Sequence, residues 1–117
     1  MATVTNEPEA PTVDAELMAH CTDAALRMQL GTSTREDIDT RTTLVIKHLN
    51  QLLAQELGAD EDSDVRDLFR QAYRLLDLTS RPTKETAAFN AFVYMRDVAN
   101  VARRLLWIYT EPSHYAT

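Results

Sequence analysis

The sequence predicts an all-α protein, namely an antiparallel four-helix bundle that follows a flexible acidic N-terminal tail. Two observations lead to this fold class. The 117 residues include only two glycines and four prolines, so the middle of the chain offers few turns. Four segments repeat their apolar residues every three or four positions, as the buried face of a helix does. Because short loops join consecutive helices, we expect antiparallel packing around the single core that a chain of this length supports.

The two ends of the chain are predicted to lie outside the bundle. Residues 1–12 combine two prolines, two glutamates and small polar residues, and they bury too little apolar surface to offset the entropy of ordering. We therefore expect a flexible tail over residues 1–12, a helical bundle over 13–111 and a C-terminal tail over 112–117.

The first helix is expected to begin near Thr12 or Val13 and to end at Gly31, since glycine is common just beyond a helix C-terminus. Asp14 and Glu16 suit the positively polarised start of this helix. Its apolar stripe is expected to contain Leu17, Cys21, Ala24 and Met28.

The second helix is expected to start at the sequence STRE. Ser33 and Glu36 match a capping box there, in which each side chain accepts a hydrogen bond from a free backbone amide. The helix is expected to continue to Gly58 and the acidic loop ADEDSD. Its apolar stripe is expected to contain Ile38, Val45, Leu49 and Leu52, with Leu53 and Leu57 beside them.

The third helix carries three arginines in a row on one side. Asp62 or Ser63 can cap its start, and it is expected to stop before Pro82. The row, in which like charges four residues apart repel one another, consists of Arg66, Arg70 and Arg74. Two explanations stay open: the guanidinium groups pair with nearby carboxylates, or they form a docking strip for an acidic partner, because arginine donors fit carboxylates and phosphates.

The fourth helix, expected over residues 82–110, is the longest and most apolar. Its seam is expected to consist of Ala88, Ala91, Met95, Val98, Ala102, Leu105 and Tyr109. Phe89, Val93 and Trp107 lie about 100° or more around the helix from the centre of that seam. They are either flanking core positions or an exposed contact face for a partner, including a homodimer through this helix.

The charge is unevenly distributed along the chain, whose net charge is −6. Residues 1–64 hold 13 acidic and 4 basic side chains, a net −9, whereas residues 65–117 hold 5 acidic and 8 basic ones, a net +3. An acidic protein is poorly suited to the phosphate contacts that dominate nucleic-acid binding, so we do not expect nucleic acid as the partner. A transcription-associated factor is the third functional alternative.

The sequence contains no motif typical of a catalytic, cofactor or metal site. With two glycines it has no glycine-rich phosphate loop, and no two of its three histidines stand four residues apart. We therefore expect no catalytic residue, no cofactor and no metal. Cys21, the only cysteine, excludes an intramolecular disulfide and suits a reducing compartment. Because no signal-peptide pattern or membrane-spanning apolar stretch is present, we expect a cytoplasmic protein without membrane contact.

A small-molecule binder, or a helical-bundle enzyme acting on an anionic ligand, is the second functional alternative. Such a protein needs a pocket between helices that is lined by apolar, aromatic and a few polar groups. The candidate lining residues are His48, Tyr73, Tyr94, Arg96 and Arg103.

Two segments, TTLVIKHLNQLL (residues 42–53) and YMRDVANVARRLLWIYTE (residues 94–111), carry a resemblance to a known family. The first is similar to a middle-helix pattern L-x-x-H-L-x-x-L-x, with His48 at the histidine position. The second partly matches the last helix of the family at Arg96, Val98, Ala99 and residues 105–109. The chain thus resembles small actinobacterial all-helical proteins of unknown activity found near natural-product biosynthesis gene clusters. The resemblance implies a bacterial cytoplasmic accessory protein and carries over no catalytic residue.

The main functional expectation is therefore a small non-enzymatic protein that binds another protein in an accessory or regulatory role. The partner is expected to be acidic where it meets the arginine row. The candidate partner-binding residues are Arg66, Arg70, Arg74, Phe89, Val93 and Trp107.

Overall fold

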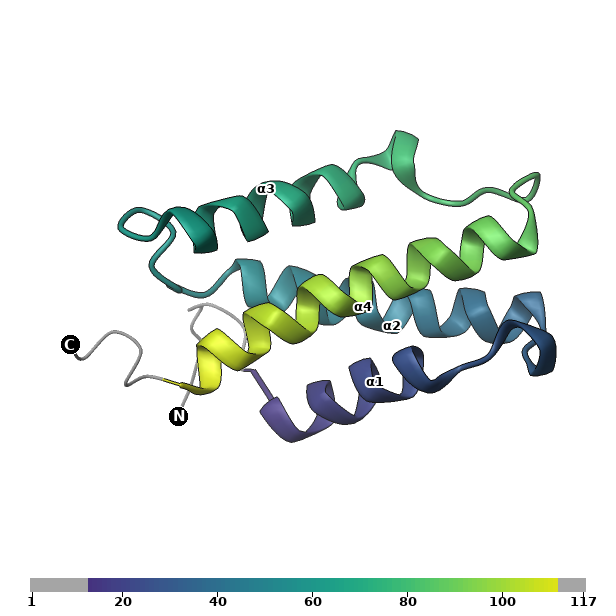
Figure 1. Cartoon of the computed structure of the whole chain (residues 1–117), viewed down its shortest axis with the longest axis horizontal. Coiled ribbons are helices and arrows are strands. Elements are labelled where there is room, and N and C mark those ends of the chain that lie inside the picture. Colours follow the sequence, from purple (N-terminus) through teal and green to yellow (C-terminus); the bar gives the residue numbers. More distant parts are fainter. Residues whose placement is uncertain (1–12, 112–117) are drawn as a thin grey trace, which may run out of the picture.

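Figure 1 shows a computed structural model of the chain, which describes residues 13–111. The elements are α1 (Ala15–Arg27), η1 (Leu30–Thr32), α2 (Arg35–Leu53), α3 (Ser63–Leu76), η2 (Leu78–Ser80) and α4 (Ala88–Thr110), where η denotes a short 3-10 helix. No β-strand occurs within residues 13–111, so the predicted all-α class is confirmed. The predicted tails lie outside the described residues. No helix in the described range has both the length and the apolar content needed to cross a membrane.

α4 is the central helix of the molecule. It packs most extensively against α2, then against α1 and then against α3, whereas α2 and α3 touch one another only slightly. Figure 1 shows α1 and α3 on opposite sides of α4, with α2 behind, and the sequence colours run in alternate directions along consecutive helices. α3 is therefore attached to the rest of the molecule mainly through α4.

The core lies where the helices face α4. The predicted stripe of the second helix is fully buried, at Ile38, Val45, Leu49 and Leu52. In α4, five of the predicted seam positions are fully buried, at Ala91, Met95, Val98, Ala102 and Leu105. The outermost seam positions, Ala88 and Tyr109, are exposed because they lie in the first and last turns of the helix.

The buried face of α1 is rotated from the predicted one. Of the predicted stripe, Cys21 is buried, Ala24 and Met28 are half-buried, and Leu17 is 56% exposed. The other buried residues of the helix are Met18, Thr22 and Ala25. The helix starts after Asp14, whose carboxylate accepts a hydrogen bond of 3.1 Å from the Leu17 amide. It ends at Arg27 rather than at Gly31, because Met28 already has extended backbone.

The capping box of α2 lies one residue later than predicted, at Thr34 and Asp37 instead of Ser33 and Glu36. The Asp37 amide donates to the Thr34 hydroxyl and the Thr34 amide donates to the Asp37 carboxylate, both at 3.0 Å. The sequence STRED fits a capping box in both frames, since each frame offers a hydroxyl followed three residues later by a carboxylate.

Two connections are longer than predicted. α2 ends at Leu53, well before Gly58, whose φ of 88° suits glycine in the loop that follows. α4 begins at Ala88 rather than at residue 82, because residues 83 to 86 form a turn in which the Thr83 amide donates to the Thr86 hydroxyl at 2.8 Å. Arg35, at the start of α2, donates hydrogen bonds to the backbone carbonyls of both threonines and so holds this connection against α2.

Two side chains of α4 bind the backbone of its neighbours. The Tyr94 hydroxyl donates to the Leu75 carbonyl near the end of α3. The Arg96 guanidinium donates to the Leu26 carbonyl of α1 at 2.9 Å and lies over the Phe92 ring. These contacts fix the position of α4 relative to both flanking helices.

Candidate functional site

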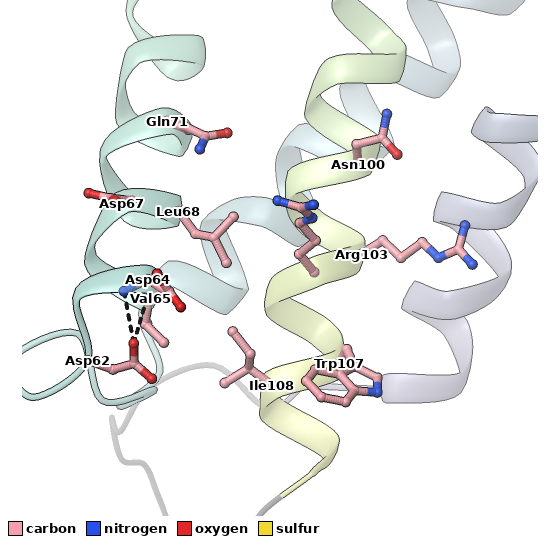
Figure 2. Close-up of a pocket in the computed structure, with 11 residues that line it drawn as sticks. Asp62, Asp64, Val65, Asp67, Leu68, Gln71, Asn100, Arg103, Trp107 and Ile108 are labelled. Atoms are coloured by element: carbon pink, nitrogen blue, oxygen red, sulfur yellow. Dashed lines mark hydrogen bonds between the residues drawn. The ribbon is translucent and has the colours of Figure 1, made fainter. Parts of the chain in front are cut away.

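A groove of about 740 Å³ lies between the N-terminal half of α3 and the C-terminal half of α4. In Figure 2, Leu68 and Gln71 extend into it from α3, and Ile108 extends into it from α4. Its apolar floor, formed by Val65, Leu68 and Ile108, belongs to the edge of the core, because these side chains are each less than 10% exposed. The charged and aromatic side chains of the site lie on the two walls beside this floor.

The α3 wall is acidic. It carries Asp62, Asp64 and Asp67, which stand at the start of α3, where the helix end attracts negative charge. Asp62 is the N-cap, as predicted, and its carboxylate accepts hydrogen bonds from the amides of Asp64 and Val65 at 2.8 and 3.4 Å. Figure 2 shows Asp67 turned outward from α4, and its carboxylate pairs with the Arg70 guanidinium at 3.4 Å.

The α4 wall is basic and aromatic, with Arg103, Arg104 and Trp107 close together along the helix. Figure 2 shows Arg103 and Trp107 on the side of α4 that is turned away from α3, so their outer ends stand at the rim of the groove. The Trp107 side chain is 56% exposed. Tryptophan and arginine are the residue types most enriched among those that dominate protein-binding energy.

The opposite charges of the two walls are not paired across the groove. Within residues 13–111, the ion pairs join Arg35 to Asp39 in α2 and Arg70 to Asp67 in α3. Neither guanidinium group of the α4 wall makes a hydrogen bond or ion pair in this range. Arginine carries five N–H donors, so this wall can bind a carboxylate-bearing second molecule.

A second hollow of about 220 Å³ continues the groove toward the end of α3. Gln71 and Asn100 line both hollows, so the two adjoin. Here the signs of the walls are reversed, because α3 contributes Arg74 and α4 contributes Asp97. Residues 62 to 75 of α3 border the whole groove, which at 1.5 Å per helical residue gives a length of about 20 Å.

The predicted arginine row does not act as one unit. Arg66 donates hydrogen bonds of 3.1 Å to the backbone carbonyls of Ala59 and Asp60, and thereby holds the acidic loop against α3. Arg70 pairs with Asp67 on the same helix. Arg74 lines the groove, and it is the one arginine of the three whose charge belongs to the groove walls.

Phe89, Val93 and Trp107 are 60%, 38% and 56% exposed and lie on one side of α4. They do not form one apolar patch. Phe89 and Trp107 are 18 residues apart, about 27 Å along the helix, and polar residues such as Asn100 and Arg103 occupy the exposed positions between them. The groove contains Trp107, whereas Phe89 and Val93 lie outside its lining.

The five candidate ligand-binding residues do not converge on one pocket. His48 is buried on α2, where its Nδ1 lies 3.3 Å from the Gln51 side-chain oxygen. Tyr73 is exposed on α3, and Arg96 reaches toward α1. Tyr94 is 7% exposed, and burial raises its pKa above the ordinary value of 10.0. Of the five, Arg103 lines the α3–α4 groove.

The sequence did not predict the groove itself, because its walls come from helices whose relative register depends on the 77–87 connection. The sequence shows the charges of the two walls separately, as an acidic start of α3 and as the dipeptide Arg103–Arg104 in α4. Only the packing of α3 against α4 brings these two charged segments to the same groove. Within the described residues, no cluster of three or more histidine, cysteine or carboxylate side chains could hold a metal ion.

Comparison of the chain with models of protein families, with curated proteins and with solved structures found no match.

Proposed function

We propose that this chain is a non-enzymatic interaction module of antiparallel four-helix architecture, which binds another protein across the groove between α3 and α4. The observation that carries the proposal is a pair of oppositely charged walls without ion pairs between them, next to a tryptophan that is 56% exposed. The apolar floor adds a surface that a partner side chain can cover. Such a mixture of an aromatic anchor, arginine and a polar rim is typical of protein interfaces.

The charge of the groove favours a protein over a small anion. An anion near Arg103 and Arg104 also meets the field of Asp62 and Asp64 on the opposite wall. A protein surface can present carboxylates to one wall and ammonium or guanidinium groups to the other. The groove also extends for about 20 Å along α3, which matches a helix of about 13 residues better than a compact metabolite.

The cellular role in this proposal is accessory or regulatory, in a cytoplasmic setting. A single cysteine that is buried at Cys21 suits a reducing compartment, because it can form no disulfide within the chain. The resemblance to small actinobacterial helical proteins supports the further proposal that this role is linked to natural-product biosynthesis.

Affinity capture from an extract of the source organism tests the proposal. The wild-type chain is compared with Arg103→Glu/Arg104→Glu, which makes both walls acidic, and with the control Lys47→Glu/Lys84→Glu, which changes the net charge equally at exposed sites outside the groove. We expect one protein to be retained by the wild type and the control but not by the groove variant. Retention of the same proteins by all three chains would contradict a docking role for the groove.

A small aromatic anion is the alternative ligand, because Trp107 offers a stacking surface beside two guanidinium groups. A ligand that binds only the native state stabilises it by RT ln(1 + L/Kd), where L is the ligand concentration, so the melting temperature rises with the logarithm of that concentration once it exceeds Kd. A shift with aromatic carboxylates for the wild type, but not for Trp107→Ala, would favour this alternative. No shift at millimolar concentrations would count against it.

A further inference from the structure

The charges along the α3–α4 groove alternate in two directions. α3 runs from acidic to basic along the groove, while α4 runs from basic to acidic over the same length. The seven charges are Asp62, Asp64, Asp67 and Arg74 on the α3 wall and Asp97, Arg103 and Arg104 on the α4 wall. The groove therefore has a four-cornered pattern in which each corner differs in sign from its two neighbours.

Such a pattern is complementary to itself. A rotation of 180° about an axis parallel to the helices, placed over the mouth of the groove, lays α3 of one copy over α4 of the other at the same height. Asp64 and Asp67 then face Arg103 and Arg104 of the second copy, and Arg74 faces the second copy's acidic corner. We propose that the groove binds a second copy of this chain, in a two-fold dimer in which α3 of each copy faces α4 of the other.

This orientation pairs more charge than the other two-fold arrangement does. An axis across the helices would lay α3 on α3, so that three carboxylates would meet Arg74 alone. It would likewise lay α4 on α4, so that Arg103 and Arg104 would meet Asp97 alone. The parallel axis instead matches three carboxylates with two guanidinium groups at one end, and one carboxylate with one guanidinium group at the other. Opposite charges facing one another favour one register over its competitors.

Some of these side chains do not point toward the opposite wall of their own groove. Figure 2 shows Asp67 turned outward from α3, and Arg103 and Trp107 turned toward the outer side of α4. In the parallel arrangement, both copies of Trp107 lie at the same end of the interface. An aromatic side chain that is 56% exposed in one copy can there lose water contact at the rim.

This inference rests on the proposed docking role of the groove and names its occupant. It is tested with two charge-reversed full-length chains. The first, Arg103→Glu/Arg104→Glu, makes both walls acidic at one end, and the second, Asp64→Lys/Asp67→Lys, makes them basic. Asp62 is kept because it caps α3. Circular dichroism and the melting temperature verify that each variant is folded. If a variant is not folded, a chain that carries Arg103→Gln, Arg104→Gln and Trp107→Ala is tested in its place.

The readout is the molar mass in sedimentation equilibrium over a range of concentrations. We expect the wild type and the control Lys47→Glu/Lys84→Glu to dimerise, and each reversed variant alone to have a dissociation constant raised at least about tenfold, because like charges then face one another. Mixing the two reversed variants restores opposite charges at both contacts. The mixture is therefore expected to form a one-to-one dimer as the wild type does. Raising the salt from about 0.1 M to about 1 M is expected to weaken it, since the Debye length falls from about 10 to about 3 Å.

Two results would overturn the inference. One is a wild-type chain that stays monomeric up to about 1 mM, the weak end of specific association. The other is a mixture of reversed variants that stays monomeric while the wild type dimerises, because the dimer then does not pair α3 with α4. If the wild type is monomeric, the affinity capture still tests the proposed docking role of the groove. That role is contradicted only if the groove variant and the control variant retain the same proteins.

Discussion

At the scale of single residues, the core polar groups are those that the sequence pattern describes least well. Tyr94 fits the apolar spacing of α4, yet its hydroxyl donates to the Leu75 carbonyl and so links α4 to α3. His48 was a candidate for lining a ligand pocket, but it is 6% exposed beside Gln51. Spacing predicts which side of a helix a residue occupies, but a hydrogen bond to another helix depends on the packing of both.

Replacing Tyr94 by phenylalanine tests this link between α3 and α4. The variant keeps the ring but loses the hydrogen bond, so we expect a loss of about 0.5–1.5 kcal/mol in unfolding free energy at neutral pH. Because burial raises the pKa of Tyr94, its neutral form stabilises the fold below pH 10.0 and this contribution is lost as the pH rises through the higher folded-state pKa. Urea unfolding between neutral and alkaline pH is expected to show a steeper alkaline loss for the wild type than for Tyr94→Phe. Parallel profiles would contradict it.

Leu105 tests the phase of α4. Its side chain is fully buried, so Leu105→Ala is expected to lower the unfolding free energy by about 2–5 kcal/mol, through lost apolar contact and a residual cavity. The control Asn90→Ala, at an exposed position of the same helix, is expected to change it by no more than about 0.5 kcal/mol. Both values come from urea titrations with a common slope. Equal effects would mean that the assigned buried face of α4 is wrong.

At the scale of helices, the sequence predicts that each of the four exists but misplaces several of their ends. The stripe of α2 and the central seam of α4 are as predicted, because long periodic segments define one face over many turns. The predicted buried face of α1 was wrong by a fraction of a turn, because a helix of 13 residues has few apolar repeats to define which side is buried. The start of α4 was misplaced because the 83–86 turn is stabilised by threonine side chains and by Arg35, which is distant in sequence.

The capping box of α2 offers a direct test at this scale. Thr34→Ala is expected to cost about 0.5–2 kcal/mol of stability, because the Asp37 amide loses its hydrogen-bond acceptor. Ser33→Ala is the matched control, since it removes a hydroxyl one residue earlier, and a change within about 0.5 kcal/mol is expected. Thermal and urea unfolding measure both. A larger loss of stability for Ser33→Ala than for Thr34→Ala would contradict the observed capping box and favour the predicted one at Ser33 and Glu36.

At the scale of the whole molecule, the candidate site arises from the way in which α3 is attached. α3 packs mainly on α4 and hardly touches α2, so the outer sides of α3 and α4 form a groove instead of closing a compact bundle. The sequence predicted three of its residues separately, Arg74 and Trp107 as partner-binding residues and Arg103 as a ligand-binding residue. It did not bring them together with Asp64 and Asp67, because that depends on how α3 packs against α4. The surface charge was readable from the sequence, but its pattern in space was not.

The central claim is that the α3–α4 groove binds protein, and site-specific photo-cross-linking tests it most directly. A benzophenone side chain replaces Trp107 in one chain and, as the control, Leu44 in another, an exposed aliphatic residue of α2 that lies outside the groove. Each chain is irradiated in cells of the source organism, and the adducts are identified by mass spectrometry. We predict a discrete protein adduct from position 107, at twice the chain mass if the partner is a second copy, that is absent from position 44. The same adducts from both positions, or none from position 107, would contradict the account.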